Sequence, residues 1–274
     1  MNHQYKDQAA GLRRLMAGPK PRIISVLSAA GKPEHTRFMT NLAAPLHRQG
    51  NTVLVVEATS TPVHEARHYG IDSNQATLLE ALLRPELLQP LITDDSRGYS
   101  VAKLLPGNTA SRFLQQDNIK QQLERLFLTM AGQHDIVLVD AALTVEDTMP
   151  LDVLHHGEIL IHMTRDTGSI TQAYTLIKRL CSQVGRRTLD IVVSHASEAQ
   201  AHVVFNNIAA VAHRHLDIKL DFAGLIPSDE HLNIAAKLGR NVIEAFPKTK
   251  AAAAFKALAG KIDHNHGLLE TSLS

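Results

Sequence analysis

From residue 22 onwards the chain alternates short apolar runs with helix-length segments, and this alternation restricts the folds it can adopt. The runs are continuous in Val, Ile and Leu, as is typical of strands buried on both faces of a sheet. We predict strands at 23–27, 53–56, 101–105, 136–139, 159–163, 191–193 and 222–226. We predict helices at 37–49, 76–83, 111–131, 168–183, 197–215, 229–238 and 249–262. Because helices between strands favour parallel crossovers, we expect an α/β fold with a doubly wound, mostly parallel sheet flanked by helices.

Two segments stand apart from this pattern. Residues 1–21 carry a short helical pattern and end in the breaker Gly18-Pro19-Lys20-Pro21, so we interpret them as an N-terminal helical arm and linker. Residues 22–262 form the α/β domain, and residues 263–274 are expected to be a flexible tail.

Composition excludes several classes of protein. A hydrophobic content of 44% over 274 residues is enough for a real core. The single thiol, Cys181, permits no internal disulfide, and the sequence shows neither a signal peptide nor an apolar run long enough to span a membrane. We therefore expect a cytoplasmic location. A net charge of +1 argues against nucleic acid as a partner.

The chain has 16 histidines, which raises the question of a metal site. His64-Glu65-Ala66-Arg67-His68 matches the zinc-protease pattern H-E-x-x-H, which needs a helix and a third ligand. Thr61-Pro62 lies one residue before the match, and the breaker Gly70-Ile71-Asp72-Ser73 follows it. We interpret the segment as a solvated loop or short helix and predict no metal site.

The turn after the first predicted strand, Ser28 to Thr36, occupies the position of a phosphate-binding loop in an α/β fold. Such a loop needs glycines that let backbone N–H groups turn inward, a Lys on the phosphate oxygens and a Ser or Thr on magnesium. Here the loop contains Pro33, Glu34 and His35 instead. A plain strand-to-helix turn, with Thr36 as an N-cap-like residue, is the simpler interpretation.

Several motifs together resemble the flagellar-number regulators of the FlhG (FleN or YlxH) family, which belong to the MinD/ParA deviant-Walker ATPases. The motifs are Asn41-Leu42-Ala43, Leu104-Leu105-Pro106-Gly107, the apolar run from Asp135 to Asp140, Ser169-Ile170-Thr171-Gln172-Ala173-Tyr174 with Ile177-Lys178, and Gly224-Leu225-Ile226-Pro227-Ser228-Asp229. The resemblance covers about 23–262 and implies a MinD-like P-loop NTPase fold.

The resemblance also implies where a nucleotide site would lie. It would comprise Gly31, Lys32, Glu34, His35, Thr36, Glu57, Asp140, Pro227 and Asp229. Within it, Thr36 falls on the family's magnesium Thr, His35 on the catalytic Lys, Glu34 on the last loop Gly and Ala30 on the signature Lys.

The chemistry at these positions departs from the family pattern. His35 is shorter than Lys and mostly neutral at neutral pH, and Glu34 places a carboxylate where phosphate would lie. Glu57 and Thr59 replace the two aspartates of the family's D-x-D motif, and Ser194 stands in place of the adenine-reading Asn. We therefore interpret the domain as a pseudo-ATPase with no catalytic residues and no bound cofactor.

The arm carries the second signal. Asp7-Gln8-Ala9-Ala10-Gly11-Leu12-Arg13 matches the D-Q-A-x-x-L-R motif that FlhG-type proteins carry ahead of the ATPase domain. The resemblance implies that Asp7, Gln8, Ala9, Leu12 and Arg13 bind and stimulate the signal-recognition-type GTPase FlhF. The alternative is an ordinary N-terminal helix packed on its own domain.

The combination predicts a regulator of flagellar number and placement that acts through its arm. A flagellar transcription activator or a basal-body component is a further candidate partner, by resemblance. Residues 249–262 form a narrow apolar strip with lysines around it, which we expect to pack on the sheet, with membrane contact at the inner face of the cell membrane or the cell pole as the alternative. Ala30 stands in place of the family's signature Lys, which argues against a nucleotide-bound homodimer.

Two other functions remain open. One is an active Mg-ATP-hydrolysing MinD/ParA-type ATPase in which Lys32 and Thr36 still work, switching between monomer and membrane-bound dimer. The other is a MinD-like factor of another system, such as chromosome partitioning or cellulose secretion. A partitioning protein needs a basic DNA-binding face, which a chain of charge +1 shows poorly.

Overall fold

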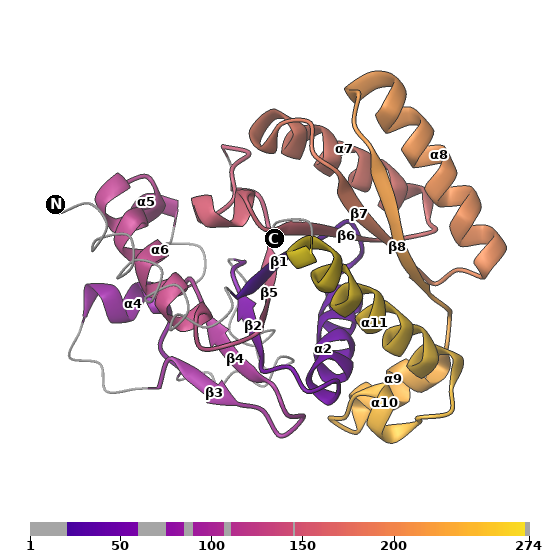
Figure 1. The fold of residues 1–274 in the computed structure, drawn as a ribbon, viewed down its shortest axis with the longest axis horizontal. Coiled ribbons are helices and arrows are strands. Elements are labelled where there is room, and N and C mark those ends of the chain that lie inside the picture. Colours follow the sequence, from indigo (N-terminus) through magenta and orange to yellow (C-terminus); the bar gives the residue numbers. More distant parts are fainter. Residues whose placement is uncertain (1–20, 60–74, 85–89, 107–110, 145, 272–274) are drawn as a thin grey trace, which may run out of the picture.

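The computed structural model describes residues 21–59, 75–84, 90–106, 111–144 and 146–271 (Figure 1). Its centre is an eight-stranded sheet with the order β3-β4-β2-β5-β1-β6-β7-β8. The strands are β1 (Arg22–Ser28), β2 (Val53–Glu57), β3 (Ile92–Asp94), β4 (Ser100–Lys103), β5 (Ile136–Ala141), β6 (Glu158–Thr164), β7 (Leu189–Ser194) and β8 (Leu220–Ile226). All neighbouring pairs are parallel except β3 with β4, which confirms the predicted fold class.

Helices cover both faces of the sheet. They are α2 (Lys32–Arg48), α4 (Leu78–Leu83), α5 (Ser111–Leu114), α6 (Asp117–Ala131), η3 (Asp152–His155), α7 (Thr167–Val184), α8 (Glu198–Leu216), α9 (Glu230–Lys237), α10 (Val242–Ala245) and α11 (Lys250–Thr271). Alternate strand residues enter two separate cores, so Ile23 packs with α6 and α7 while Ile24 packs with α2 and α11. The protein thus has three layers, α/β/α.

The structure differs from the predicted elements in a few places. Strand β3 was not predicted, because three half-exposed residues at the sheet edge carry no hydrophobic pattern. The segment predicted as one helix over 111–131 is divided into α5 and α6.

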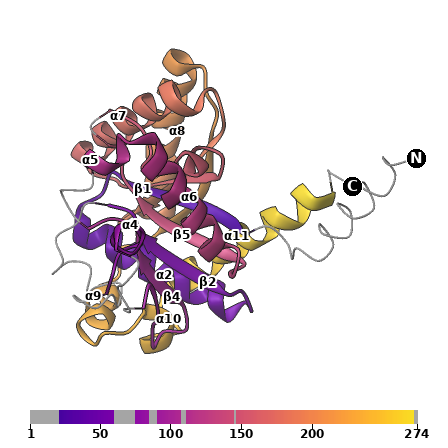
Figure 2. The same ribbon diagram turned by 90° about the vertical axis from the view of Figure 1, so that its left-hand side faces the viewer.

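The last helix, α11, packs as predicted and runs further than predicted. Phe255, Leu258 and Ile262 are buried in the core between α2 and β8, so the apolar strip of 249–262 is covered by the protein itself. The helix then continues to Thr271 and extends away from the sheet (Figure 2), so residues 263–271 are helical. No proline interrupts this segment, and the helix has no stop signal at 263.

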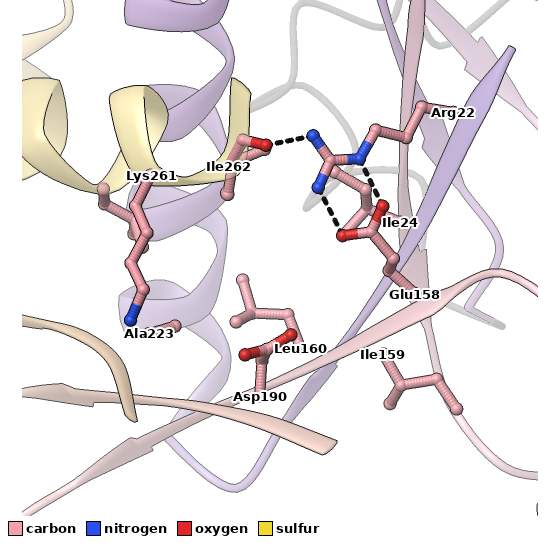
Figure 3. Close-up of a pocket in the computed structure, with 10 residues that line it drawn as sticks. Arg22, Ile24, Glu158, Ile159, Leu160, Asp190, Ala223, Lys261 and Ile262 are labelled. Atoms are coloured by element: carbon pink, nitrogen blue, oxygen red, sulfur yellow. Dashed lines mark hydrogen bonds and ion pairs between the residues drawn. The ribbon is translucent and has the colours of Figure 1, made fainter. Parts of the chain in front are cut away.

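A buried ion pair holds α11 at the amino edge of the sheet (Figure 3). The guanidinium of Arg22 makes two hydrogen bonds to the Glu158 carboxylate and a third to the carbonyl of Ile262. A cavity of about 20 Å³, enough for one water, lies beside this pair and is also lined by Asp190 and Lys261. This edge is opposite the carboxyl edge, where α/β folds place ligands.

Candidate functional site

The turn between β1 and α2 is only three residues long. Helix α2 begins at Lys32, not near Arg37 as predicted, with Gly31 at the N-cap and Pro33 in the first turn. The amides of Glu34 and His35 each donate to the carbonyl of Gly31 at 3.0 Å. These two N–H groups are bound within the helix, so they do not point into an open phosphate cradle.

Thr36 has a different role from the one expected of an N-cap or of a magnesium ligand. It is buried in the second turn of α2, and its hydroxyl donates to the carbonyl of Lys32 at 3.1 Å. Lys32 itself is exposed at the start of the helix.

His35 points into the protein and binds Asp140. Its Nε2 lies 3.0 Å from Oδ1 of Asp140, near the end of β5, and the two side chains are each 5% exposed. Its Nδ1 lies 3.3 Å from Nδ1 of His162 on β6, whose Nε2 lies 2.8 Å from Oγ of Ser194 on β7. We call this series, Asp140–His35–His162–Ser194, the histidine chain. It occupies the carboxyl end of the sheet that the sequence assigned to phosphate and magnesium.

The histidine chain satisfies its hydrogen bonds with both imidazoles neutral in one arrangement. His35 donates from Nε2 to Asp140, His162 donates from Nδ1 to Nδ1 of His35, and Nε2 of His162 accepts from the Ser194 hydroxyl. Burial first, and then the neighbouring imidazole of His35, lower the pKa of His162 well below its usual value. His162 is therefore neutral near neutral pH.

A Ser–His hydrogen bond is also the signature of a nucleophile and its base. Here the hydroxyl of Ser194 is inaccessible, because the residue is 1% exposed and His162 is 0% exposed. The ring of Phe38 stacks on His162 with centroids 4.2 Å apart. The histidine chain is thus closed to substrate in this structure.

Glu34 joins the start of α2 to the end of β7. Its Oε2 lies 2.6 Å from a guanidinium nitrogen of Arg37 and 2.9 Å from Nε2 of His195. Burial opposes the charged form of Glu34, but the hydrogen bonds from His195 and Arg37 outweigh it and lower the pKa of the carboxyl to about 2. The same hydrogen bond raises the pKa of His195, which has a left-handed backbone with φ of 57°. Glu34 is therefore an ionised carboxylate already bound by the guanidinium of Arg37 and the imidazole of His195.

The remaining predicted site residues divide into two places. Glu57, at the end of β2, is fully buried beside Asp140 in the register of β2 and β5, and accepts a hydrogen bond from Thr59. Asp229 follows β8, three strands away from β1, and serves as the N-cap of α9 with a 2.7 Å contact to Nδ1 of His231. Pro227 precedes it in the same loop. The structure thus brings His35, Asp140 and Glu57 together but gives Asp229 a capping role.

Other predictions fall outside the described residues. Asp7, Gln8, Ala9, Leu12 and Arg13 belong to this group, as does the H-E-x-x-H match at 64–68. Within the described part of the chain, no three His, Cys, Asp or Glu side chains form a metal-binding group, and no helix is long and apolar enough to cross a membrane.

Sequence reasoning missed His162 and His195. His162 lies in the run Ile159-Leu160-Ile161-His162-Met163, which has the pattern of an ordinary buried strand. A single polar side chain in such a strand needs a hydrogen-bonding partner, and that requirement was the available signal.

Comparison with known proteins identifies proteins that are similar to this chain. No protein-family model matches it. It is 28% identical over 247 residues to the antiactivator FleN of Pseudomonas aeruginosa, covering 88% of this chain and 86% of FleN. The chain is thus similar to FleN over most of the length of both proteins.

Solved structures with the same fold include MinD proteins. The septum site-determining protein MinD of Pyrococcus horikoshii, solved with Mg-ADP, superposes with a TM-score of 0.66 over 90% of this chain and 98% of that one, at 18% identity. A chain of the MinC:MinD cell division complex of Aquifex aeolicus has a TM-score of 0.67 over 89% and 96%, at 17% identity. This protein therefore has the MinD/ParA P-loop NTPase fold, with the histidine chain at the carboxyl end of its sheet.

Proposed function

We propose that this protein regulates flagellar number and placement by binding partners, and that its MinD-like domain does not hydrolyse ATP. The observation that carries the second half is the contact between His35 and Asp140. A phosphate-binding lysine needs an anion from the ligand, whereas here an imidazole is already satisfied by a carboxylate of the protein. The bound amides of Glu34 and His35 support the same interpretation.

The first half rests on the arm and on the relationship to FleN. Asp7, Gln8, Ala9, Leu12 and Arg13 form the motif that would bind an FlhF-type GTPase and stimulate GTP hydrolysis. Gln8 would orient a water or contact a phosphate, and Arg13 would pair with an acidic rim. Since FleN is named an antiactivator, a flagellar transcription activator is a second proposed partner, and a basal-body component is a third.

The test of the arm is GTP turnover by the FlhF-type GTPase in the presence of the full-length protein. We expect stimulation by the wild type and its loss in Gln8→Ala. Gln4→Ala, an amide-to-methyl change in the same segment but outside the motif, is the matched control and should stimulate normally. Equal turnover with wild type and Gln8→Ala would refute the role of the arm.

The test of the domain is calorimetric titration of the full-length protein with Mg-ATP. We expect no saturable binding at micromolar concentrations. Clear micromolar binding would favour the alternative, an active MinD/ParA-type ATPase that uses Lys32 and Thr36, and would overturn the pseudo-ATPase proposal. A cycle between monomer and ATP-bound homodimer would then also be open.

We propose a cytoplasmic location. The apolar strip of 249–262 is occupied by core contacts, which argues against that strip as a membrane anchor. Any residence at the inner face of the cell membrane or at the cell pole would then come from a partner.

A further inference from the structure

A cleft of about 770 Å³ lies along one side of α2, away from the histidine chain. Its other walls are the β3–β4 turn at Asp95–Arg97 and the end of α9 with the residues that follow it. These segments are far apart in sequence and meet around α2 (Figure 1). The volume is in the range of small-molecule sites.

The lining of the cleft is basic. Among the residues that the structure describes, it contains the cationic side chains of Arg37, Arg97, Lys237 and Arg240 and one carboxylate, that of Asp95. Asp95 is committed to Arg97, since its two oxygens lie 2.6 and 2.8 Å from two guanidinium nitrogens. The cleft therefore presents an excess of positive charge to whatever enters it.

Two of these cations are held by carboxylates and two are not. Arg97 is held by Asp95 and lies over the ring of Tyr99 at 5.1 Å, while Arg37 is held by Glu34 at 2.6 Å. Lys237 and Arg240 are exposed and within the described residues neither forms an ion pair, although Arg240 makes a 3.5 Å hydrogen bond to the carbonyl of Glu244. Fixed guanidinium groups reduce the entropy lost on binding, and mobile ones can close on a ligand.

The composition of the walls selects the class of ligand. Guanidinium and ammonium groups match phosphate oxygens in charge and geometry. The lining residues that the structure describes include no aromatic side chain on which a nucleobase could stack. We propose that this cleft binds a small anion that carries two or more phosphate groups and is recognised through them rather than through a base.

Of the cleft's lining residues that the structure describes, only Thr36 also belongs to the nominal nucleotide site. His35 and Asp140 do not line the cleft, and the hydroxyl of Thr36, which does, is bound to the backbone of α2. The proposal therefore does not depend on whether the histidine chain excludes ATP.

The test is calorimetric titration of the full-length protein with inorganic tripolyphosphate, without magnesium and at low salt. We expect one saturable site per chain, weakened roughly tenfold or more in the double variant Lys237→Gln/Arg240→Gln. The matched control is Arg125→Gln/Arg214→Gln, which removes the same charge from exposed positions on α6 and α8. Both double variants should unfold at the temperature of the wild type, since none of these side chains is buried.

Two further titrations define the ligand. ATP without magnesium should bind no more tightly than tripolyphosphate, and a hexaglutamate peptide should bind more weakly. The proposal is overturned by equal loss in the two double variants, by tighter binding of ATP or of hexaglutamate, or by no saturable binding below about 1 mM.

Discussion

Replacing His35 by alanine should destabilise this protein strongly, and the size of the loss follows from the geometry. The change removes a 3.0 Å hydrogen bond to the carboxylate of Asp140, which is 3% exposed, and a 3.3 Å contact to His162, which is 0% exposed. A hydrogen bond to a buried charged group contributes about 1.5–3 kcal/mol, and one between neutral groups about 1 kcal/mol. We therefore predict a loss of about 2.5–4 kcal/mol in the free energy of unfolding.

The sign of this effect separates two roles for the residue. A residue kept for binding phosphate is held in place at some expense to the folded state, so removing it from a ligand-free protein is often neutral or stabilising. A residue kept to complete a buried network stabilises the folded state, so removing it leaves Asp140 and His162 without His35 in a place that water does not reach.

The measurement is urea unfolding of wild type and His35→Ala, followed by circular dichroism at neutral pH. His213→Ala is the control, because this imidazole is exposed on α8 and the change should cost less than about 0.5 kcal/mol. A double-mutant cycle with Asp140→Asn should give a coupling energy of about 1–3 kcal/mol.

The reasoning is refuted if His35→Ala is as stable as the His213 control or more stable than wild type. A coupling energy near zero would equally show that His35 and Asp140 do not act as a pair. In either event the residues at the end of β1 and β5 would be available to a ligand, and the pseudo-ATPase proposal would lose its structural support.

Two other carboxyl groups give predictions with a defined pH window. Burial, and then the negative charge of Glu158, raise the pKa of Asp190 (Figure 3) from 3.8 to about 6. The stability that the protonated form of Asp190 contributes is therefore lost as pH rises through about 6. In urea unfolding at a series of pH values, Asp190→Asn should be as stable as wild type in acid and more stable by about 2 kcal/mol above neutrality. An unchanged pH dependence would contradict this. Against the effect of burial, His195 and Arg37 lower the pKa of Glu34 from 4.5 to about 2, so its contribution to stability is present above pH 4.5 and is lost as pH falls toward 2. Glu34→Gln should lower the unfolding free energy by about 2 kcal/mol near neutrality, and the variant should then lose less stability than wild type on acidification. Equal losses of stability on acidification in the two proteins would disprove this prediction.

The sheet was predictable because its strands are buried on both faces. Runs such as Val53 to Val56 have no polar interruption, and the helices between them leave little choice but parallel crossovers. Strand β3 was not predictable, because Ile92-Thr93-Asp94 is short, half-exposed and defined by its antiparallel partner rather than by its own sequence.

The start of α2 was predictable in principle, and the resemblance to a phosphate-binding loop obscured it. Pro33 and Glu34 are typical of the first turn of a helix, where the missing N–H of proline does no harm and a carboxylate meets the positive end of the helix dipole. Read for these signals alone, the sequence places the helix near Lys32. The side-chain partners of His35 were beyond reach, because His162 and Ser194 come from strands whose order in the sheet the sequence does not state.

The histidine at position 35 links the chemistry of the site to the proposed function. In the family pattern, a lysine at this position places a cation at the end of β1. The phosphate of the ligand is then needed to neutralise that cation. An imidazole needs only one donor and one acceptor, and Asp140 and His162 supply both from within the fold. If, as proposed, the domain does not bind ATP, the folded state is complete without a ligand, and ATP would not drive a change of conformation. A protein with this site can be regulated at its surface, through the arm or the basic cleft along α2, and these are the places where its activity should be sought.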